Sequence, residues 1–485
     1  MSLISWRGAL PRIDWKQVAA RYLPFADAAS VDLPLPRLLR LALFQVSVGL
    51  CTALIVGTLN RVMIVELGVG AWLVSLMVAL PLLAAPFRAL IGLKSDLHRS
   101  FLGWKRVPFL WFGTLMQFGG LAIMPFALIL LSGQGALQLW AGHAAAALAF
   151  VLVGAGLQTV QTAGLALATD LAPEDTRPRV VALMYVMLLV GMVGGGLVFG
   201  LALVEYSHTR LVQVVQGTAV AGVLLNLIAA WKQEPRNALR AKEPPPQQSF
   251  RSHWARFVAQ RGVPRFLLTT GLGTAAFNMQ DIILEPYGGE VLHLGVGATT
   301  QLTALMALGA LFAFGLAARW LARGGDPCRV AAAGVLFGVV AFSAVIFSDP
   351  LGAPLLFRAG ATLIGFGGGL FAVGSLSAAM ALEAHGLHGL VLGAWGAVQA
   401  TCAGASVALG GALRDGAALA ASSGWLGEAL QGPATGYAVV YQLELAMLFA
   451  TLIALGPLVR RGGKPAIGSR AAPPATPFGL AEFPG

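Results

Sequence analysis

The sequence predicts an all-α polytopic membrane protein with twelve transmembrane helices in two six-helix halves. Of its 485 residues, 57% are hydrophobic and only 11% are charged, whereas a soluble domain carries about a quarter charged residues. Apolar runs of about 20 residues recur from Leu41 to Val459, and each is long enough to cross the ~30 Å hydrocarbon core of a bilayer. One long polar stretch, residues 232–264, separates six runs from six others. This pattern excludes a soluble globular protein.

The predicted spans are joined by short connections on either side of that polar stretch. The first half holds spans at about residues 41–60, 69–92, 107–131, 141–168, 180–203 and 211–231. The second half holds spans at about residues 265–286, 297–317, 330–347, 355–382, 389–412 and 438–459. We therefore predict an N-terminal six-helix bundle over residues 38–231, a basic cytoplasmic linker over 232–264 and a C-terminal six-helix bundle over 265–459.

The formal net charge of +11 is explained by where the basic residues lie. Of the 32 lysines and arginines, 27 fall in the N-terminal segment, alternate loops, the linker or the C-terminal tail. Cytoplasmic segments of membrane proteins carry such an excess. Both termini are therefore predicted to be cytoplasmic, and the basic balance implies no nucleic-acid partner.

The two terminal segments are expected to lie outside the bundles. Residues 1–37 show no apolar core of a cleavable signal peptide, so the first span is expected to direct its own insertion. Their stretch "IDWKQVAARYL" predicts either an interfacial helix on the cytoplasmic leaflet or a short packed cap. Residues 460–485, rich in Pro, Gly and Ala, are predicted to be disordered. Cys51, Cys328 and Cys402 lie in different segments and supply neither a disulfide framework nor a metal site.

The first and seventh spans end in charged residues at similar positions. The first ends "GTLNRVMIVEL" and the seventh "FNMQDIILEP", which aligns Asn60-Arg61 with Gln280-Asp281. Asp281 follows Arg265 by 16 residues, or about 24 Å along a helix, which places it in the outer third of the bilayer. An acid there needs a partner, and we expect an Arg61–Asp281 ion pair that locks the two halves on the periplasmic side. Alternatively, both side chains reach the headgroups separately.

The seventh span is predicted to stop at "EPYGGEV", with Glu285 at the outer interface. Pro286 has no N–H to donate, Tyr287 suits the interface, and Gly288-Gly289 permit a tight turn. The stretch "NRVMIVEL", which contains Glu66, is expected to end the first span in the same way.

The loops after the second and eighth spans, "GLKSDLHRSFLGWKR" and "GLAARWLARGGDPCR", are both short and basic. Two six-helix halves around a basic cytoplasmic linker resemble the major facilitator superfamily, whose halves are related as repeats. Asp96 resembles the acid of that superfamily's loop motif, which implies that it braces the cytoplasmic gate. Arg88, about a turn from the cytoplasmic end of the second span, is expected either to snorkel inward or to pair with Asp96 or Asp170.

Other polar and small residues in the spans indicate packing more than chemistry. "GMVGGGLVFG" places Gly191 and Gly195 at GxxxG spacing, which favours close helix contact. Glu444 is a lone acid in the twelfth span. No nucleophile–base pair, metal-ligand cluster or phosphate-binding loop is visible in the sequence.

Several stretches together resemble the PucC/LhaA family, a branch of the major facilitator superfamily found in purple phototrophs and associated with bacteriochlorophyll delivery. The resemblance covers residues 21 to about 460 and rests on the number and order of the stretches. They are "RYLPFADAASVDLPLPRLLRLALFQVSVGL", "GTLNRVMIVELGV", "APFRALIGLKSDLHRSFLGWKRVPF", "QFGGLAIMPFALILLSG", "TAGLALATDLAPEDTRPRVVALMYVMLLVGM" and "MQDIILEPYGGEVL".

The resemblance implies an assembly factor for photosynthetic light-harvesting complexes, not an enzyme. It implies that bacteriochlorophyll is handed to the light-harvesting alpha and beta antenna polypeptides, or that their assembly is chaperoned, with the reaction centre–antenna core as a further partner. It also implies the bacterial inner, intracytoplasmic photosynthetic membrane, in contact with lipid. The family's signature and gate positions are Asn60, Arg61, Glu66, Asp96, Asp170, Gln280, Asp281, Glu285, Pro286 and Tyr287.

A bound bacteriochlorophyll would need one neutral donor for its magnesium, and imidazole serves well. His143, in "LQLWAGHAAAALAF", is the one histidine inside a predicted span, beside alanines that leave a flat face. Alternatively, interfacial water or a neighbouring helix satisfies this histidine. Gln158 and Gln161 in the fourth span are further candidate ligands.

The alternative function is a secondary transporter of a small amphiphilic molecule. A central cavity with polar lining would serve it, and the candidate residues are Gln45, Thr52, Gln158, Gln161, Thr274 and Asn278. A pigment synthase is disfavoured because no acid-rich diphosphate motif occurs. Since a fold alone does not define a function, a bacteriochlorophyll absorption band in the purified protein is the observation that separates the two readings.

Overall fold

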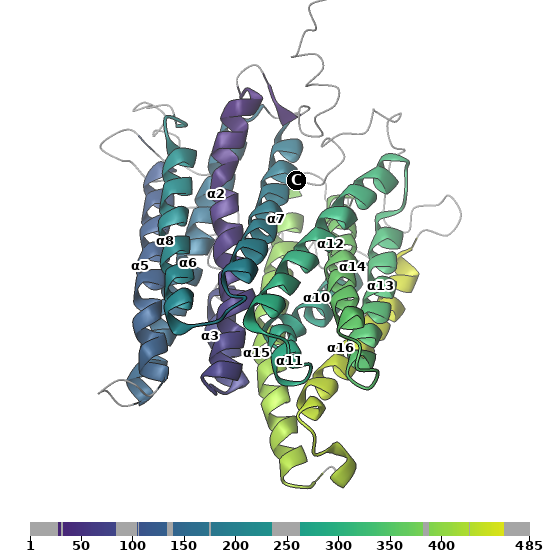
Figure 1. The fold of residues 1–485 in the computed structure, drawn as a ribbon. Coiled ribbons are helices and arrows are strands. Elements are labelled where there is room, and N and C mark those ends of the chain that lie inside the picture. Colours follow the sequence, from purple (N-terminus) through teal and green to yellow (C-terminus); the bar gives the residue numbers. More distant parts are fainter. Residues whose placement is uncertain are drawn as a thin grey trace, which may run out of the picture.

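The computed structural model describes residues 28–30, 33–83, 104, 106–132, 139–173, 176–234, 262–381, 388–425 and 427–459. These residues form helices and turns, and no strand occurs among them. The helices lie in two bundles side by side, α2 to α8 in one and α10 to α16 in the other (Figure 1). Ten helices of the described chain are long and apolar enough to cross a membrane. The prediction of an all-α multi-pass membrane protein is confirmed.

Each bundle has six main helices, matching the predicted spans. The first bundle comprises α2 (Leu35–Leu54), α3 (Ala71–Leu83), α5 (Val107–Leu131), α6 (Leu139–Leu171), α7 (Arg177–Ala202) and α8 (His208–Ala230). The second comprises α10 (Val263–Asn278), α12 (Val296–Ala322), α13 (Pro327–Ser348), α14 (Pro354–Met380), α15 (His388–Ser422) and α16 (Ala434–Leu455). Short 3-10 turns, η6 (Glu428–Leu430) and η7 (Gly456–Leu458), lie before and after α16.

The chain reverses direction between successive main helices, so each bundle has two ends. We call the end where α8 stops and α10 starts the linker end. The opposite end, which carries the α2–α3, α7–α8 and α15–α16 turns, is the distal end. By the charge pattern of the sequence, the distal end is the one predicted to face the periplasm.

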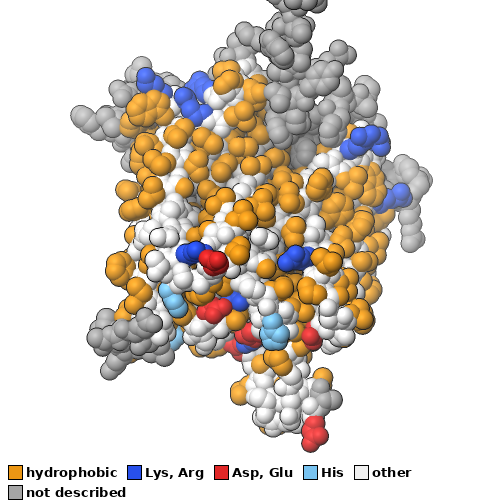
Figure 2. Space-filling view, viewed as in Figure 1, with side chains coloured by type: hydrophobic (Ala, Val, Ile, Leu, Met, Phe, Trp, Pro, Cys, Tyr) orange, Lys and Arg blue, Asp and Glu red, His pale blue; other side chains and the backbone are white. Residues whose placement is uncertain are grey.

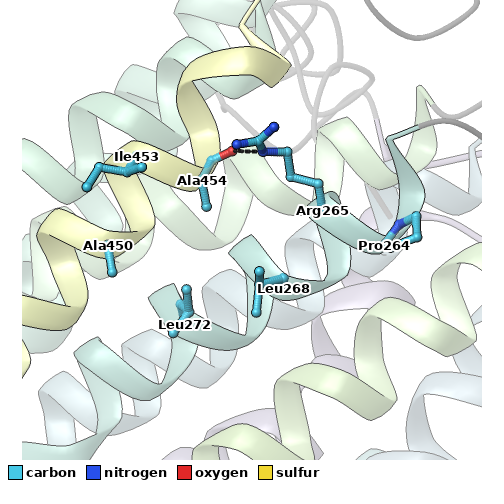
Figure 3. A pocket seen from close by; sticks show the side chains of 7 residues that line it. All are labelled: Pro264, Arg265, Leu268, Leu272, Ala450, Ile453 and Ala454. Atoms are coloured by element: carbon cyan, nitrogen blue, oxygen red, sulfur yellow. Dashed lines mark hydrogen bonds between the residues drawn. The ribbon is translucent and has the colours of Figure 1, made fainter.

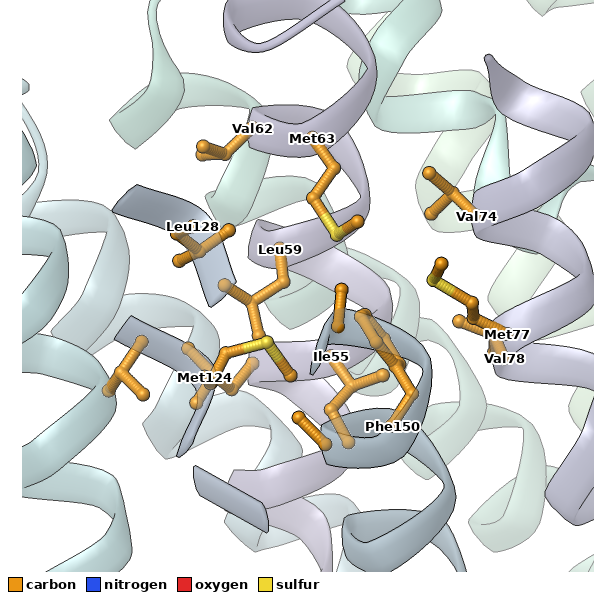
Figure 4. Close-up of a cluster of buried hydrophobic side chains, with 14 of the residues drawn as sticks. Ile55, Leu59, Val62, Met63, Val74, Met77, Val78, Met124, Leu128 and Phe150 are labelled. Carbon is orange, nitrogen blue, oxygen red and sulfur yellow. The ribbon is translucent and has the colours of Figure 1, made fainter. Parts of the chain in front are cut away.

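A continuous apolar core joins the two bundles near the distal end. Ile55, Leu59 and Met63 pack with side chains of α3, α5 and α6 (Figure 4). The same cluster takes in Ile282 and Val407 from the second bundle. Hydrophobic side chains also cover most of the visible outer face (Figure 2). That surface suits hydrocarbon, because apolar area exposed to water is unfavourable.

Close contact between α2 and α7 depends on glycine. A Cβ at Gly49 would lie 2.1 Å from the Leu188 carbonyl oxygen, and one at Gly191 would lie 2.4 Å from the Val46 carbonyl oxygen. Both distances are far below van der Waals contact, so a side chain at either position would push the helices apart. Helix packing through small residues, expected from the GxxxG spacing, is thus confirmed at Gly191.

The seventh span is not the single helix over 265–286 that the sequence predicts. α10 ends at Asn278, a 3-10 turn (η5, Met279–Ile282) follows, and a new helix, α11 (Leu284–Glu290), continues toward the distal end. Pro286 therefore lies in the first turn of a helix and does not stop one, because an N–H in the first turn has no helical acceptor. Gly289 lies inside α11, where a Cβ would lie 3.0 Å from the Arg61 guanidinium.

The first and eleventh spans are longer than predicted. α2 ends at Leu54, and two π-helical turns, η2 (Ile55–Leu59) and η3 (Val62–Glu66), carry the first span past Asn60. α15 runs ten residues beyond the predicted end at 412, to Ser422. The charged pair Arg414-Asp415 lowers the hydropathy there, but the pair is held by partners in neighbouring elements, as described below.

Candidate functional site

The two bundles are joined at the distal end by Asn60, which lies between η2 and η3. Its Nδ2 donates to the Ile282 carbonyl at 3.2 Å and to Glu285 Oε2 at 3.2 Å, with the Asp281 carbonyl at 3.5 Å. These acceptors lie at the break between α10 and α11, where backbone carbonyls leave the regular helical pattern and accept other donors. The fully buried amide of Asn60 thus donates hydrogen bonds to the broken helix of the opposite bundle.

Glu285 is the carboxylate at the centre of this junction, and it is 2% exposed. Its Oε1 accepts from Thr303 Oγ1 on α12 at 3.1 Å, while its Oε2 accepts from the asparagine. Thr303 also packs closely against the first bundle, because a Cβ at Gly57 would lie 2.0 Å from the Thr303 hydroxyl oxygen. Three elements, α2 with its π-turns, α11 and α12, therefore meet around one carboxylate. We call this set, Asn60, Gly57, Glu285 and Thr303, the inter-half junction.

The expected Arg61–Asp281 ion pair does not form between these two described residues. Arg61 pairs with Glu66 and donates from Nη2 to the Leu294 carbonyl at 3.1 Å. In a π-helix the residue five positions on lies over the first one, so η3 brings Glu66 to Arg61. Asp281 Oδ1 instead accepts from Gln280 Nε2 at 2.7 Å. Arg61 still bridges the halves, but it does so through a backbone carbonyl.

Tyr206, in the turn between α7 and α8, lies beside this ion pair. Burial raises the pKa of the Tyr206 hydroxyl, the Glu66 carboxylate raises it further, and the Arg61 guanidinium lowers it. The hydroxyl therefore stays neutral at physiological pH and adds no charge to the junction.

A second contact between the halves lies at the same end and was not predicted from the sequence. Asp415 Oδ2 on α15 accepts from the Trp72 backbone N–H on α3 at 2.9 Å. Arg414 holds Asp415 at 2.9 Å, pairs with Glu290 and lies 4.6 Å from the centre of the Tyr437 ring. Tyr437 in turn donates to Glu290 at 2.8 Å. Two charged residues in succession within an apolar run were the signal that could have revealed this cluster.

The linker end holds one of the predicted gate acids. Asp170 pairs with Arg106 at 3.0 Å, and Glu234 accepts from the Arg106 backbone N–H at 3.0 Å. A carboxylate at a helix start satisfies free N–H groups, so Glu234 caps α5. The other two predicted partners at this end, Arg88 and Asp96, lie outside the described residues.

The three candidate pigment ligands lie on α6 but do not form one site. His143 is partly buried near the distal end, whereas Gln158 and Gln161 are partly buried in the middle of the helix. Fifteen residues of helix separate His143 from Gln158, about 22 Å along the axis. Gln158 Oε1 is buried without a hydrogen-bond partner. The glutamine oxygen and the histidine are thus separate candidates.

The polar residues proposed for a transport cavity are partly satisfied within their own helices. Thr52 Oγ1 donates to the Val48 carbonyl at 2.9 Å, and Asn278 Nδ2 donates to the Thr274 carbonyl at 2.7 Å. Gln45 is fully buried and neither of its amide atoms has a partner. Its role in a transport cavity stays a prediction.

An apolar groove of about 530 Å³ opens between α10 and α16 at the linker end (Figure 3). Its lining residues are Pro264, Arg265, Leu268, Leu272, Ala450, Ile453 and Ala454. The Arg265 guanidinium donates to the Ala454 carbonyl at 3.2 Å. This hydrogen bond holds the guanidinium at the mouth of the groove. Such a surface suits an amphiphile with an apolar tail and an oxygen-bearing head. No group of three or more potential metal ligands occurs in the described part of the chain.

Two bundles of six helices, joined by polar contacts at one end, define a membrane protein of the major facilitator type. The crystal structure of a mutant of the nucleoside transporter NupG superposes with a TM-score of 0.66 at 13% identity, covering 87% of this chain and 100% of that one. A likeness at this identity establishes the fold alone.

The sequence comparisons identify the family within this class. The family model described as "PUCC protein" matches residues 58–463. The chain is 53% identical to an "uncharacterized protein in puhA-bchM intergenic region" of Rhodobacter capsulatus, over 96% of this chain and 98% of the relative. It is 55% identical to "Protein PucC" of Rhodovulum sulfidophilum, over 82% and 89%. A more distant relative, 30% identical over 88% of this chain and 96% of the relative, is the "bacteriochlorophyll synthase 44.5 kDa chain" of Rhodobacter capsulatus. The chain belongs to the PucC family.

Proposed function

We propose that this protein handles bacteriochlorophyll in the photosynthetic inner membrane and assists the assembly of light-harvesting complexes. Its clients are the alpha and beta antenna polypeptides, to which pigment is delivered or whose assembly is chaperoned. The observation that carries the proposal is family membership over nearly the whole chain, with relatives more than 50% identical. A pigment-related name on a more distant relative supports it.

The surface and interior of the protein fit a pigment cargo better than a small polar solute. Bacteriochlorophyll combines a long apolar tail with a ring that carries oxygen acceptors and a magnesium ion. The groove between α10 and α16 has apolar walls for the tail, and Arg265 at its mouth is a donor for a ring oxygen. Gln158 Oε1, buried and unpartnered, or His143 would supply the neutral donor that magnesium prefers.

Pigment bound to the purified protein tests the proposal. The protein, purified in mild detergent from a phototrophic host, is expected to carry a near-infrared bacteriochlorophyll band. His143→Leu and Gln158→Leu each test one ligand, and His208→Leu, at an exposed histidine, is the matched control. Loss of pigment in one variant identifies the ligand. Full pigment content in both variants rejects both residues, and pigment-free wild-type protein rejects binding.

The groove has its own test. Ala450→Trp places a large ring between α10 and α16 and is expected to lower the pigment content. Leu224→Trp, on the exposed face of α8, adds an equally large ring away from the groove. Equal pigment content in both variants would show that the groove does not hold the tail.

Deletion of the gene tests the biological role. We expect antenna complexes to be depleted while the enzymes of pigment synthesis stay active, because the protein acts after the pigment is made. Normal antenna levels in a deletion strain without a related gene would contradict the assembly role.

A secondary transporter of a small amphiphile is the second candidate, favoured by the likeness in fold to a nucleoside transporter. Its discriminating result is pigment-free protein that moves an amphiphile across reconstituted vesicles. A transporter needs the inter-half junction to open and close, whereas a carrier that presents pigment along its lipid-facing surface does not.

A further inference from the structure

An acid lies at the middle of α16 without any partner. Glu444 is 0% exposed, and neither of its carboxylate oxygens has a hydrogen-bond partner. Within a bilayer, acids face protein or water and pair with a cation or donor, because an isolated charge is poorly solvated there. Glu444 has no hydrogen-bond donor and no paired cation among the described residues, and this needs an explanation.

The neighbours of Glu444 belong to the break in the seventh span. The backbone N–H of Gln280 approaches its carboxylate, though not within hydrogen-bond geometry, and Asp281 is the charged group that acts on it most directly. Gln280 Oε1 is fully buried and unpartnered, as is the hydroxyl of Tyr441, three residues before Glu444 on α16. η5, which contains Gln280 and Asp281, packs against α16, so buried polar side chains with unmet hydrogen bonds lie on both of these neighbouring elements.

Among the described residues, no ion pair joins a cation to Glu444 or Asp281. α16 packs against α10, α13, α15 and η5, and none of the arginines that the structure describes there forms an ion pair with Glu444. Arg265 is bonded to Ala454 near the far end of α16, and Arg414 is held by Glu290 and Asp415. The remaining titratable groups on these elements or at their ends are Asp281, Asp326, Cys328, Arg329, Asp349, His388, Cys402, Tyr437 and Tyr441. Glu285 on α11 is the further acid that acts on Asp281.

We propose that Glu444 and Asp281 form a proton-binding site, with Glu444 the neutral acid at physiological pH. A proton is the smallest ligand that removes the charge, and the described residues here include too few acids for a divalent ion. When the O–H bond of Glu444 breaks, the proton leaves to water and a carboxylate charge appears beside Asp281, on which Glu285 also acts. Like charges in a low-dielectric interior repel strongly.

That repulsion acts on the connection between the halves. Gln280 holds Asp281 at 2.7 Å, and the carbonyls of Asp281 and Ile282 are the acceptors for Asn60 across the boundary. A displacement of η5 therefore loosens the inter-half junction. The inference is that release of this proton favours separation of the halves at the distal end. It does not depend on the pigment cargo, so its failure leaves the proposed function untouched.

Infrared spectroscopy tests the protonation state without any substitution that risks misfolding. The purified wild-type protein at pH 7 is expected to show the carbonyl stretch of a protonated carboxylic acid, and the band is expected to lose the intensity of one acid in Glu444→Gln. The matched control, Glu428→Gln at an exposed acid, is expected to keep the band. Absence of the band from the wild type at pH 7, or a band of undiminished intensity in Glu444→Gln, overturns the proposal.

Distance measurements test the link to the junction. Spin labels at Glu205→Cys and Asp349→Cys, exposed distal positions in the two halves, report their separation in a chain whose native cysteines are replaced by alanine. Raising the pH from 7 to 10 is expected to lengthen the distance in the wild type and not in Glu444→Gln. A pH-independent distance in the wild type, or an equal shift in Glu444→Gln, overturns the link. A distance that depends on sodium concentration and not on pH shows a metal cation in place of the proton, and also overturns it.

Discussion

Replacing Asn60 by alanine should weaken the inter-half junction without unfolding either bundle. Across the halves the change removes two hydrogen bonds of 3.2 Å, to the Ile282 carbonyl and to Glu285 Oε2. It also removes Oδ1, which accepts from the neighbouring Arg61 N–H in either arrangement. The contact at 3.5 Å to the Asp281 carbonyl is too long to contribute much. The two bonds across the halves exist only while the halves are in contact, so their loss acts on the closed arrangement alone.

The magnitude follows from the two bonds. A neutral hydrogen bond contributes about 0.5–1.5 kcal/mol and one to a charged group about 1.5–3 kcal/mol, so the closed arrangement should lose about 2–4 kcal/mol. At about 1.4 kcal/mol per factor of ten, the ratio of closed to open molecules falls roughly 30- to 1,000-fold. Glu285 also keeps one partner, Thr303, and loses the other.

The assay is the distance distribution between spin labels at Glu205→Cys and Asp349→Cys. Asn60→Ala should add a longer distance at pH 7. Asn278→Ala is the matched control, because Asn278 donates at 2.7 Å to the Thr274 carbonyl of its own helix. An unchanged distribution in Asn60→Ala, or the same change in the control, would refute the role assigned to the junction.

Two further predictions concern packing and topology. Gly297→Ala should separate α7 from α12 and lower thermal stability, because its Cβ would lie 2.4 Å from the Gly200 carbonyl oxygen. In contrast, a Cβ at Gly194 meets nothing within 4 Å, so Gly194→Ala should gain about 0.5–1 kcal/mol from helix propensity. Thermal unfolding of both variants checks this, and equal stabilities would contradict it. Cysteine tags near residue 245 should label from the cytoplasm and tags near residue 425 from the periplasm, and the opposite labelling of either would break the twelve-span topology.

The arrangement of spans was predictable because hydropathy and loop charge are properties of about 20 neighbouring residues each. The same local signals singled out the distal parts of the first and seventh spans, where Asn60 and Glu285 do meet across the halves. They also placed Asp170 at the linker end, where it pairs with Arg106. The outline of the candidate site was therefore present in the sequence.

The partners of the charged residues were not predictable in this way. Arg61 pairs with Glu66 and not with Asp281 because a π-helical turn shifts the helix face by one residue. No residue pattern in the sequence predicted this turn. Pro286, expected to stop a helix, lies in the first turn of one, because the helical break comes before it. Such local backbone changes follow from packing between segments far apart in the chain.

The sequence by itself determined that this protein spans a membrane many times, in two six-helix halves, and that it belongs to the PucC family. Only the tertiary structure decided which polar groups share one environment. It brought Glu444 to the broken helix at Gln280, 164 residues away in the chain, and it formed the groove between α10 and α16. The physical reason is that hydropathy places a helix in the bilayer, whereas its rotation and its breaks depend on the shapes of the helices packed against it.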